Sequence, residues 1–245
     1  MNLIRIILKI TLLCLLAVQT YAVDPTFNSK IDYQVGTDPQ SLFAADLDGD
    51  GDQDLAVANL NTANVSVLKN NGNGTFGGAV NYGTGSSAHS VYAADLDGDG
   101  DLDLAVASFA NFVSVLKNNG DGTFGVSVNY PATGSPASIF AEDFDGDGKQ
   151  DIVTANWSGN SVTVRINNGD GTFPFLGITH IIAPTSDNGP FSVYAADLDG
   201  DGKPDLATAN YNTQTISILT KHRRWQFHSN GTVWSRQYPC ICFCH

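Results

Sequence analysis

The sequence predicts an all-β protein, a β-propeller of about four four-stranded blades. A nine-residue acidic stretch that begins at Asp46 returns at Asp95, Asp143 and Asp197, with spacings of 49, 48 and 54 residues. Short apolar, β-branched and aromatic runs flank each copy, and a hairpin sequence follows three of the four copies at nearly the same distance. A period near 50 residues that contains four strand-like runs is typical of one propeller blade per repeat.

Each repeat places its elements in the same order. A first run such as Ser-Val-Tyr-Ala-Ala precedes the acidic stretch, and a second run such as Leu-Ala-Val-Ala-Asn follows it. After a variable turn come a third run (Val65 to Lys69), an Asn-Asn-Gly-Asn-Gly-Thr-Phe hairpin and a fourth run (Ala79 to Tyr82). Asn-Gly and Asp-Gly between alternating runs are typical of β-hairpin turns. The repeat therefore predicts four antiparallel strands.

A further run of the fourth type, Ile31 to Val35, precedes the first repeat. It would complete the last blade if the ring closed, and closure matters because an open sheet edge invites pairing with another chain. Two architectures stay open: a small closed propeller, or an incomplete piece of a larger one.

The acidic stretches have the pattern of calcium loops. Carboxylates occupy positions 1, 3, 5 and 9, and glycines at positions 4 and 6 allow sharp turns. Position 7 is Asp in two copies and Lys in two, so it can contribute only its backbone carbonyl oxygen. The predicted ligand positions are Asp46, Asp48, Asp50, Asp52, Asp54, Asp95, Asp97, Asp99, Asp101, Asp103, Asp143, Asp145, Asp147, Lys149, Asp151, Asp197, Asp199, Asp201, Lys203 and Asp205. Without a cation these carboxylates would repel one another, so we expect bound Ca²⁺.

Two other interpretations of these loops fit the sequence less well. An EF-hand needs a bidentate Glu at position 12 on a helix, but that position holds Val57, Val106, Thr154 and Thr208 within strand-like runs. A set of solvated acidic turns would not keep the same carboxylate positions in four copies while position 7 changes.

At this point the chain resembles the FG-GAP and VCBS repeat proteins, which include the integrin α-subunit propeller. The resemblance rests on Ala-Asp-Leu-Asp-Gly-Asp-Gly-x-x-Asp-Leu-Ala and Asn-Asn-Gly-Asp-Gly-Thr-Phe, and it covers about Asp24 to Leu219. It implies that the four acidic loops bind calcium, and that rings in this family are often larger, commonly of seven blades. The third repeat departs from the pattern, with Phe173-Pro174 in place of Phe-Gly.

The first 22 residues are predicted to be a secretory signal peptide. Arg5 and Lys9 precede an apolar run from Ile10 to Val18, which is too short for a membrane span. We therefore expect residues 23–220 to be secreted and to act outside the cell, in a periplasm or at a cell surface, without membrane insertion. All 25 acids but only six of the 12 cations lie in that segment, which argues against binding to nucleic acid or anionic lipid.

Residues 221–245 do not continue the repeat. Lys221-His222-Arg223-Arg224-Trp225 stands where the Asn-Gly hairpin should be, and three of the four cysteines follow. Reading one base later gives an Asn-x-Gly-Asp-Gly-like sequence for suitable codons, so we interpret this tail as frameshifted. The alternative is a metal-binding tail through Cys240, Cys242, Cys244 and His245, although a second ligand pair at zinc-site spacing is missing from it.

The variable turns are candidates for ligand binding. They lie at the opposite strand ends from the acidic loops and each carries one large residue, at Leu60, Phe109, Trp157 and Tyr211. Such residues stack on a sugar or anchor a protein partner, or they pack between blades.

We expect a calcium-binding module for protein or carbohydrate ligands and not an enzyme. The repeats lack recognisable catalytic motifs, and His89 and His180 stand in inter-blade turns, where we expect surface residues. The alternatives are a non-catalytic propeller within a secreted polysaccharide-degrading enzyme, or a structural spacer. The sequence leaves the oligomeric state open.

Overall fold

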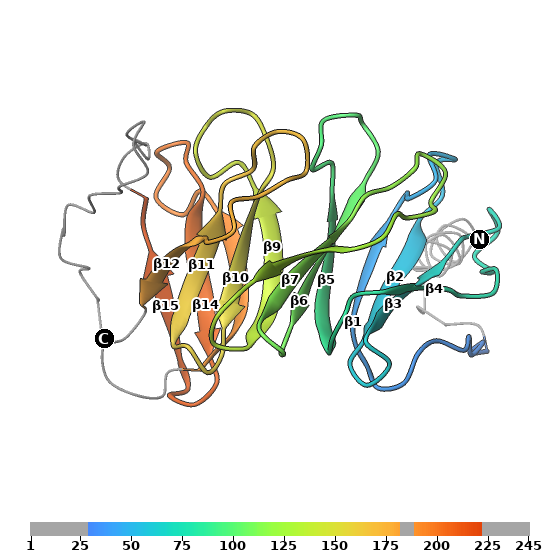
Figure 1. Cartoon of the computed structure of the whole chain (residues 1–245), viewed down its shortest axis with the longest axis horizontal. Coiled ribbons are helices and arrows are strands. Elements are labelled where there is room, and N and C mark those ends of the chain that lie inside the picture. Colours follow the sequence, from blue (N-terminus) through green and yellow to red (C-terminus); the bar gives the residue numbers. More distant parts are fainter. Residues whose placement is uncertain (1–28, 182–188, 222–245) are drawn as a thin grey trace, which may run out of the picture. The chain divides into compact units, whose positions relative to one another are not determined.

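The structure, a computed structural model, describes residues 29–181 and 189–221 (Figure 1). The chain divides into two compact units, Met1–Asp32 and Tyr33–His245, and every described strand belongs to the second. The predicted signal peptide and the tail after Lys221 lie outside the described residues. Among the residues described, no helix is long and apolar enough to cross a membrane.

In the described residues, fifteen strands form four antiparallel sheets, which we call blades 1 to 4. Within each blade the strands pair in chain order, so the predicted up-and-down, all-β propeller architecture is confirmed. Blade 1 contains β1 (Pro39–Ala45), β2 (Asp54–Asn59), β3 (Asn64–Leu68) and β4 (Val80–Gly83); blade 2 contains β5 (Ala88–Ala94), β6 (Asp103–Ser108), β7 (Phe112–Leu116) and β8 (Val128–Pro131); blade 3 contains β9 (Pro136–Glu142), β10 (Asp151–Asn156), β11 (Ser161–Arg165) and β12 (Ile178–Ile181); blade 4 contains β13 (Pro190–Ala196), β14 (Asp205–Asn210) and β15 (Thr215–Leu219).

The hydrophobic core lies between consecutive blades. Three clusters of buried side chains join blade 1 to blade 2, blade 2 to blade 3 and blade 3 to blade 4. Because strand residues alternate between the two faces, Val65 and Val67 of β3 face blade 2, where they meet Val91 of β5. Blades 2 and 3 therefore each bury one face against the blade before and the other against the blade after, whereas blades 1 and 4 each have one neighbour among the described blades.

One aromatic side chain from the first strand of every blade adds to these contacts. Phe43, Tyr92, Phe140 and Tyr194 pack in series, with ring centroids 4.6, 4.8 and 4.8 Å apart. They occupy the same position of the repeat, so an aromatic residue at this one position connects all four blades. Ring pairs at such distances add to the stabilisation from buried area alone.

The segment before blade 1 occupies the position of a missing fourth strand. Tyr33 meets Phe76 edge to face at 5.5 Å, as Tyr82 meets Phe124 at 5.3 Å. The Tyr33 hydroxyl also accepts a hydrogen bond from the backbone amide of Phe76, at 3.0 Å. The structure assigns no strand at Ile31 to Val35, and within its described part β15 is the last strand of a three-stranded blade. The predicted pairing of these two segments is therefore not made within the described chain.

Candidate metal sites and an aromatic surface

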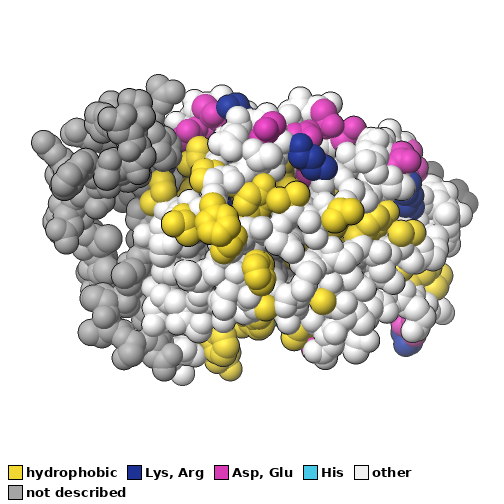
Figure 2. Space-filling model, in the orientation of Figure 1, with side chains coloured by type: hydrophobic (Ala, Val, Ile, Leu, Met, Phe, Trp, Pro, Cys, Tyr) yellow, Lys and Arg dark blue, Asp and Glu magenta, His cyan; other side chains and the backbone are white. Residues whose placement is uncertain are grey.

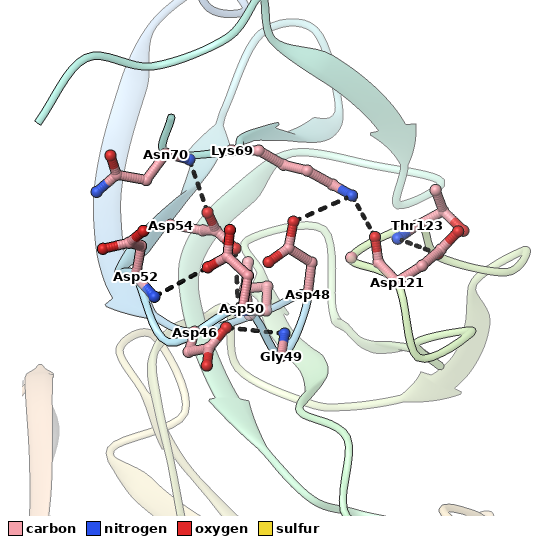
Figure 3. Close-up of polar contacts among 12 residues, drawn as sticks. Asp46, Asp48, Gly49, Asp50, Asp52, Asp54, Lys69, Asn70, Asp121 and Thr123 are labelled. Carbon is pink, nitrogen blue, oxygen red and sulfur yellow. Dashed lines mark hydrogen bonds and ion pairs between the residues drawn. The ribbon is translucent and has the colours of Figure 1, made fainter. Parts of the chain in front are cut away.

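Each acidic loop joins the first and second strands of its blade and is folded around its first aspartate. In blade 1 the carboxylate of Asp46 accepts hydrogen bonds from the amides of Gly49, at 2.8 Å, and Gly51, at 2.9 Å (Figure 3). Both glycines have positive φ, 75° and 93°, which explains why the sequence keeps glycine there. The same pair of bonds recurs around Asp95, Asp143 and Asp197.

This folding gathers carboxylate oxygens from alternate residues. Three aspartates in each loop place one oxygen atom apiece within 4.8 Å of one another. The groups are Asp46, Asp48 and Asp50; Asp95, Asp97 and Asp99; Asp143, Asp145 and Asp151; and Asp197, Asp199 and Asp205. Figure 2 shows acidic side chains gathered along one edge of the molecule, with basic side chains among them. A cluster of hard oxygen donors of this kind suits Ca²⁺.

The aspartate at position 3 has an oxygen atom without a partner in two of the loops. In blade 1, Asp48 Oδ2 lies 3.4 Å from Lys69 Nζ, whereas Oδ1 is buried and accepts no hydrogen bond. In blade 2, Asp97 Oδ2 lies 3.1 Å from Lys117 Nζ, and its Oδ1 is likewise buried and unpaired. A buried carboxylate oxygen without a partner is costly, and a cation in the loop would remove that cost. The residues present therefore fit a bound metal ion.

At position 7 the side chains differ between the loops. The lysines of blades 3 and 4 pair with the position-5 carboxylate of their own loop: Lys149 Nζ lies 3.0 Å from Asp147 Oδ2, and Lys203 Nζ contacts Asp201 Oδ2. Asp52, Asp101 and Lys149 lie against hairpin glycines Gly72, Gly120 and Gly169, so closely that a Cβ on any of these glycines would lie within 3 Å of them. Their backbone amides donate to the position-5 carboxylates, as Asp52 does to Asp50 at 2.9 Å. The use of position 7 through its backbone carbonyl oxygen stays a prediction.

The aspartate at position 9 joins the loop to the hairpin of its own blade. Asp54 is fully buried, and its two oxygens accept hydrogen bonds from the amides of Leu47, at 3.0 Å, and Asn70, at 2.7 Å. Asp103, Asp151 and Asp205 make the equivalent pairs. Burial outweighs these bonds and raises the pKa of Asp103 to about 6 and that of Asp151 to about 7. Position 9 therefore has a structural role that does not depend on a bound metal ion.

Polar contacts also connect the loop of one blade to the hairpin of the next. Asn118 Nδ2 in blade 2 donates to the carbonyl oxygen of Leu47 in the loop of blade 1, at 2.7 Å. Asn167 makes the same contact with Leu96, at 2.6 Å, and Lys69 donates to the carbonyl oxygen of Asp121 (Figure 3). In the fourth repeat Lys221 takes the position of these asparagines, and its amide still donates to Asp205, at 2.7 Å. The acidic loops are thus part of the contact between blades.

Three of the four predicted ligand-face residues come together at the other ends of the strands. Phe109, Trp157 and Tyr211 join one aromatic cluster with His89 and Phe191, with neighbouring centroids 4.0 to 6.4 Å apart. The exposed fractions are 36% for Trp157, 40% for Phe191 and 72% for Tyr211. Leu60, in blade 1, is half-buried and does not belong to this cluster. Phe109 packs between blades, whereas Tyr211 presents its ring to solvent.

The expectation that His89 is a surface residue is wrong. It lies in β5, is 8% exposed, and its Nδ1 donates to the carbonyl oxygen of Ala137 in blade 3, at 2.6 Å. Burial lowers its pKa, so the neutral ring is favoured. The side chain of His180 lies outside the described residues. Phe191 was missed, although it stands in the repeat where His89 does, immediately before the serine of the first strand.

Comparison with known families identifies the repeat. The FG-GAP-like repeat family matches three overlapping segments, residues 46–106, 95–154 and 143–208. Each segment spans two consecutive acidic loops, and together the segments cover well over half of the chain. The chain belongs to the FG-GAP-like repeat family. It matched none of the curated proteins with which it was compared.

Solved structures with a similar arrangement come from varied proteins. A lectin of Agrocybe aegerita that recognises non-reducing terminal N-acetylglucosamine is 26% identical, with 73% of this chain and 51% of the lectin covered and a TM-score of 0.48. The V. cholerae biofilm matrix protein Bap1 is 21% identical, with 74% and 26% covered and a TM-score of 0.44. The Photorhabdus luminescens Tc holotoxin pore is 23% identical, with 74% and 8% covered and a TM-score of 0.45. The chain spans about half the length of the lectin and a smaller share of the other two.

Proposed function

We propose that this chain is a secreted, calcium-stabilised binding module that presents an aromatic surface to a carbohydrate or protein ligand. The observation that carries the proposal is that the acidic loops and the aromatic cluster lie at opposite ends of the strands. The acidic loops lie at one end of β2, β6, β10 and β14, and the turns that carry the aromatic cluster lie at the other end of the last three of these strands. In this proposal the acidic loops stabilise the fold, and the aromatic turns contact the ligand.

Calcium supports the fold in two ways. It would be held by the clustered aspartates and would satisfy the unpaired oxygens of Asp48 and Asp97. It would also fix loops that the next blade contacts through Asn118 and Asn167. Extracellular calcium modules have dissociation constants of about 10⁻⁴–10⁻³ M, so at millimolar calcium each filled site adds roughly 1.4 kcal/mol at the tighter end of that range.

The aromatic cluster supports a binding function. Exposed aromatic rings bury area with little loss of side-chain entropy, and they stack equally well on the apolar face of a sugar or on a partner's side chain. Trp157 and Tyr211 come from different blades, and Phe191 bridges them with centroid distances of 6.4 and 6.0 Å. The histidine whose side chain is described is buried and bonded to a backbone carbonyl, which favours a structural role over a catalytic one.

A binding screen with matched variants tests the proposal. The purified chain is screened in calcium against a glycan array and immobilised extracellular matrix proteins, together with Trp157→Ala and Tyr211→Ala. Each variant should weaken binding to a selected ligand at least tenfold, because each removes an exposed ring. Leu60→Ala is the control, since it changes the corresponding turn outside the cluster. Binding that survives both aromatic substitutions would contradict the assignment of this surface.

A further inference from the structure

The two end blades expose positions that the interior blades bury. Leu42 of β1 is 58% exposed, whereas its counterparts Val91, Ile139 and Val193 are each 3–4% exposed. These three counterparts all face the preceding blade. In blade 1 the same face is open, and Tyr33, Val35, Leu42, Leu55, Val57 and Leu68 are among the residues that line a groove of about 360 Å³ on it.

In blade 4 the opposite face is open, the one that a following blade covers in blades 1 to 3. Ile216 of β15 is 74% exposed and Ile218 is 47% exposed. The corresponding valines of β3, β7 and β11 are 0–3% exposed, because the next blade covers them: Val65, Val67, Val113, Val115, Val162 and Val164. Tyr194, the last ring of the aromatic series, is 60% exposed for the same reason.

The unpaired edge strand β15 indicates how the open faces of blade 4 and blade 1 would fit together. Within the described part of the chain, β15 lacks the fourth strand that β3, β7 and β11 each have. Tyr33 already makes the contact with its hairpin phenylalanine that a fourth-strand tyrosine makes. In blades 1 and 2 that tyrosine lies opposite the first valine of the third strand, Tyr82 opposite Val65 and Tyr130 opposite Val113. The equivalent partner of Tyr33 is therefore Ile216.

We propose that two copies of this chain associate end to end, with blade 4 of one copy packed against blade 1 of the other and Tyr33 placed opposite Ile216. The proposed contact between the two copies has the same form as the three contacts between neighbouring blades within one chain. It would bring together apolar side chains at the corresponding positions of the repeat. Each copy has both open faces, one on blade 1 and one on blade 4, so a second copy can cover either face. Because the two surfaces differ, the interface is heterologous, and two copies close only if the second pair of faces also meets.

Sedimentation equilibrium of the full chain in calcium tests this, over a range of protein concentrations. Wild type should have a mass above that of one chain. Leu42→Asp and Ile216→Asp should each weaken association at least tenfold, because each places a carboxylate in the contact. Val126→Asp is the control, since Val126 is 93% exposed and lies outside both faces. Both test positions are exposed, so thermal melts should show that the variants remain folded.

Mixing the two variants distinguishes this interface from a symmetric one. An equimolar mixture of Leu42→Asp and Ile216→Asp retains one intact pair of faces, so it should form a heterodimer that neither variant forms alone. A symmetric interface between identical faces could not be restored in this way. The proposal is overturned if the wild type is monomeric at every concentration, if the two variants keep the wild-type mass, or if their mixture stays monomeric.

Discussion

The contact between Asn118 and the loop of the preceding blade gives a prediction whose size follows from the structure. Asn118 is 7% exposed. Its Nδ2 donates to the carbonyl oxygens of Leu47, at 2.7 Å, and Leu102, at 3.0 Å, and its Oδ1 accepts from Gly120 and Gly122, both at 3.1 Å. Asn118→Ala removes all four bonds and keeps the backbone bond to Asp103.

Asn70 is the matched control, because it holds the same position in blade 1 but no described blade precedes it. Its side chain makes two exposed bonds, to the Gln53 carbonyl oxygen and the Gly72 amide, both at 3.1 Å. At about 1 kcal/mol for each buried bond and somewhat less for each exposed one, Asn118→Ala should cost about 3–4 kcal/mol and Asn70→Ala about 1 kcal/mol. A domain of this size loses about 2–4 °C in Tm per kcal/mol.

Differential scanning calorimetry in saturating calcium measures both variants. The expected decrease in Tm is about 6–16 °C for Asn118→Ala and about 2–4 °C for Asn70→Ala. Because Asn118 also fixes Leu47 in the blade 1 loop, its substitution should weaken calcium binding to that loop. Equal decreases in Tm for the two variants would refute the idea that the hairpin of one blade stabilises the loop of another.

Three further predictions follow from individual contacts. Asp52→Lys should leave the number of bound calcium ions unchanged in equilibrium dialysis, because position 7 turns its side chain toward the hairpin and already holds Lys149 and Lys203 in other loops; loss of one ion would show that this carboxylate is a ligand. Burial lowers the pKa of His89 below its ordinary value near 6.5, so the unfolded chain binds this proton more readily and the contribution of His89 to stability should fall as the pH drops below about 6.5, whereas the raised pKa values of Asp103 and Asp151 act in the opposite direction. His89→Asn, which keeps a donor for Ala137, should therefore lose less stability than the wild type in thermal melts between pH 7.5 and 5.5, and an identical pH dependence of the two proteins would exclude a contribution from His89. Ala63→Gly should raise stability by up to about 1 kcal/mol in a denaturant titration, because Ala63 has a φ of 51°, and a loss of stability would show that its methyl group matters more than backbone strain.

The repeat itself made much of this structure predictable. Four copies of one acidic loop, each between two apolar runs, fix the order and pairing of the strands, because the first three strands of the blade recur four times and the fourth strand three times. The glycines at positions 4 and 6 follow from the positive φ that the loop requires, as Gly49 and Gly51 show. Ile31 to Val35 could also be recognised as a fourth run, and Tyr33 does make the expected contact with a hairpin ring.

What could not be predicted depends on contacts between different repeats. A periodic pattern does not show that His89 reaches the backbone of Ala137 in blade 3, or that Phe191 completes a cluster with rings from three turns. Arg165 is another case, because it stands where blades 1 and 2 have leucine, yet it is 2% exposed. It donates to the carbonyl oxygens of Pro131, Pro174 and Phe175, next to the point where the third repeat departs from Phe-Gly.

The central claim is that calcium in the acidic loops stabilises the blades, and a thermal melt of the chain in 1 mM calcium and in excess chelator tests it most directly. Four sites at roughly 1.4 kcal/mol each give about 5–6 kcal/mol, which corresponds to a rise in Tm on the order of 10–20 °C. The account predicts a cooperative transition in calcium and a much lower or broader one in chelator. Melting curves that coincide in the two buffers would contradict it.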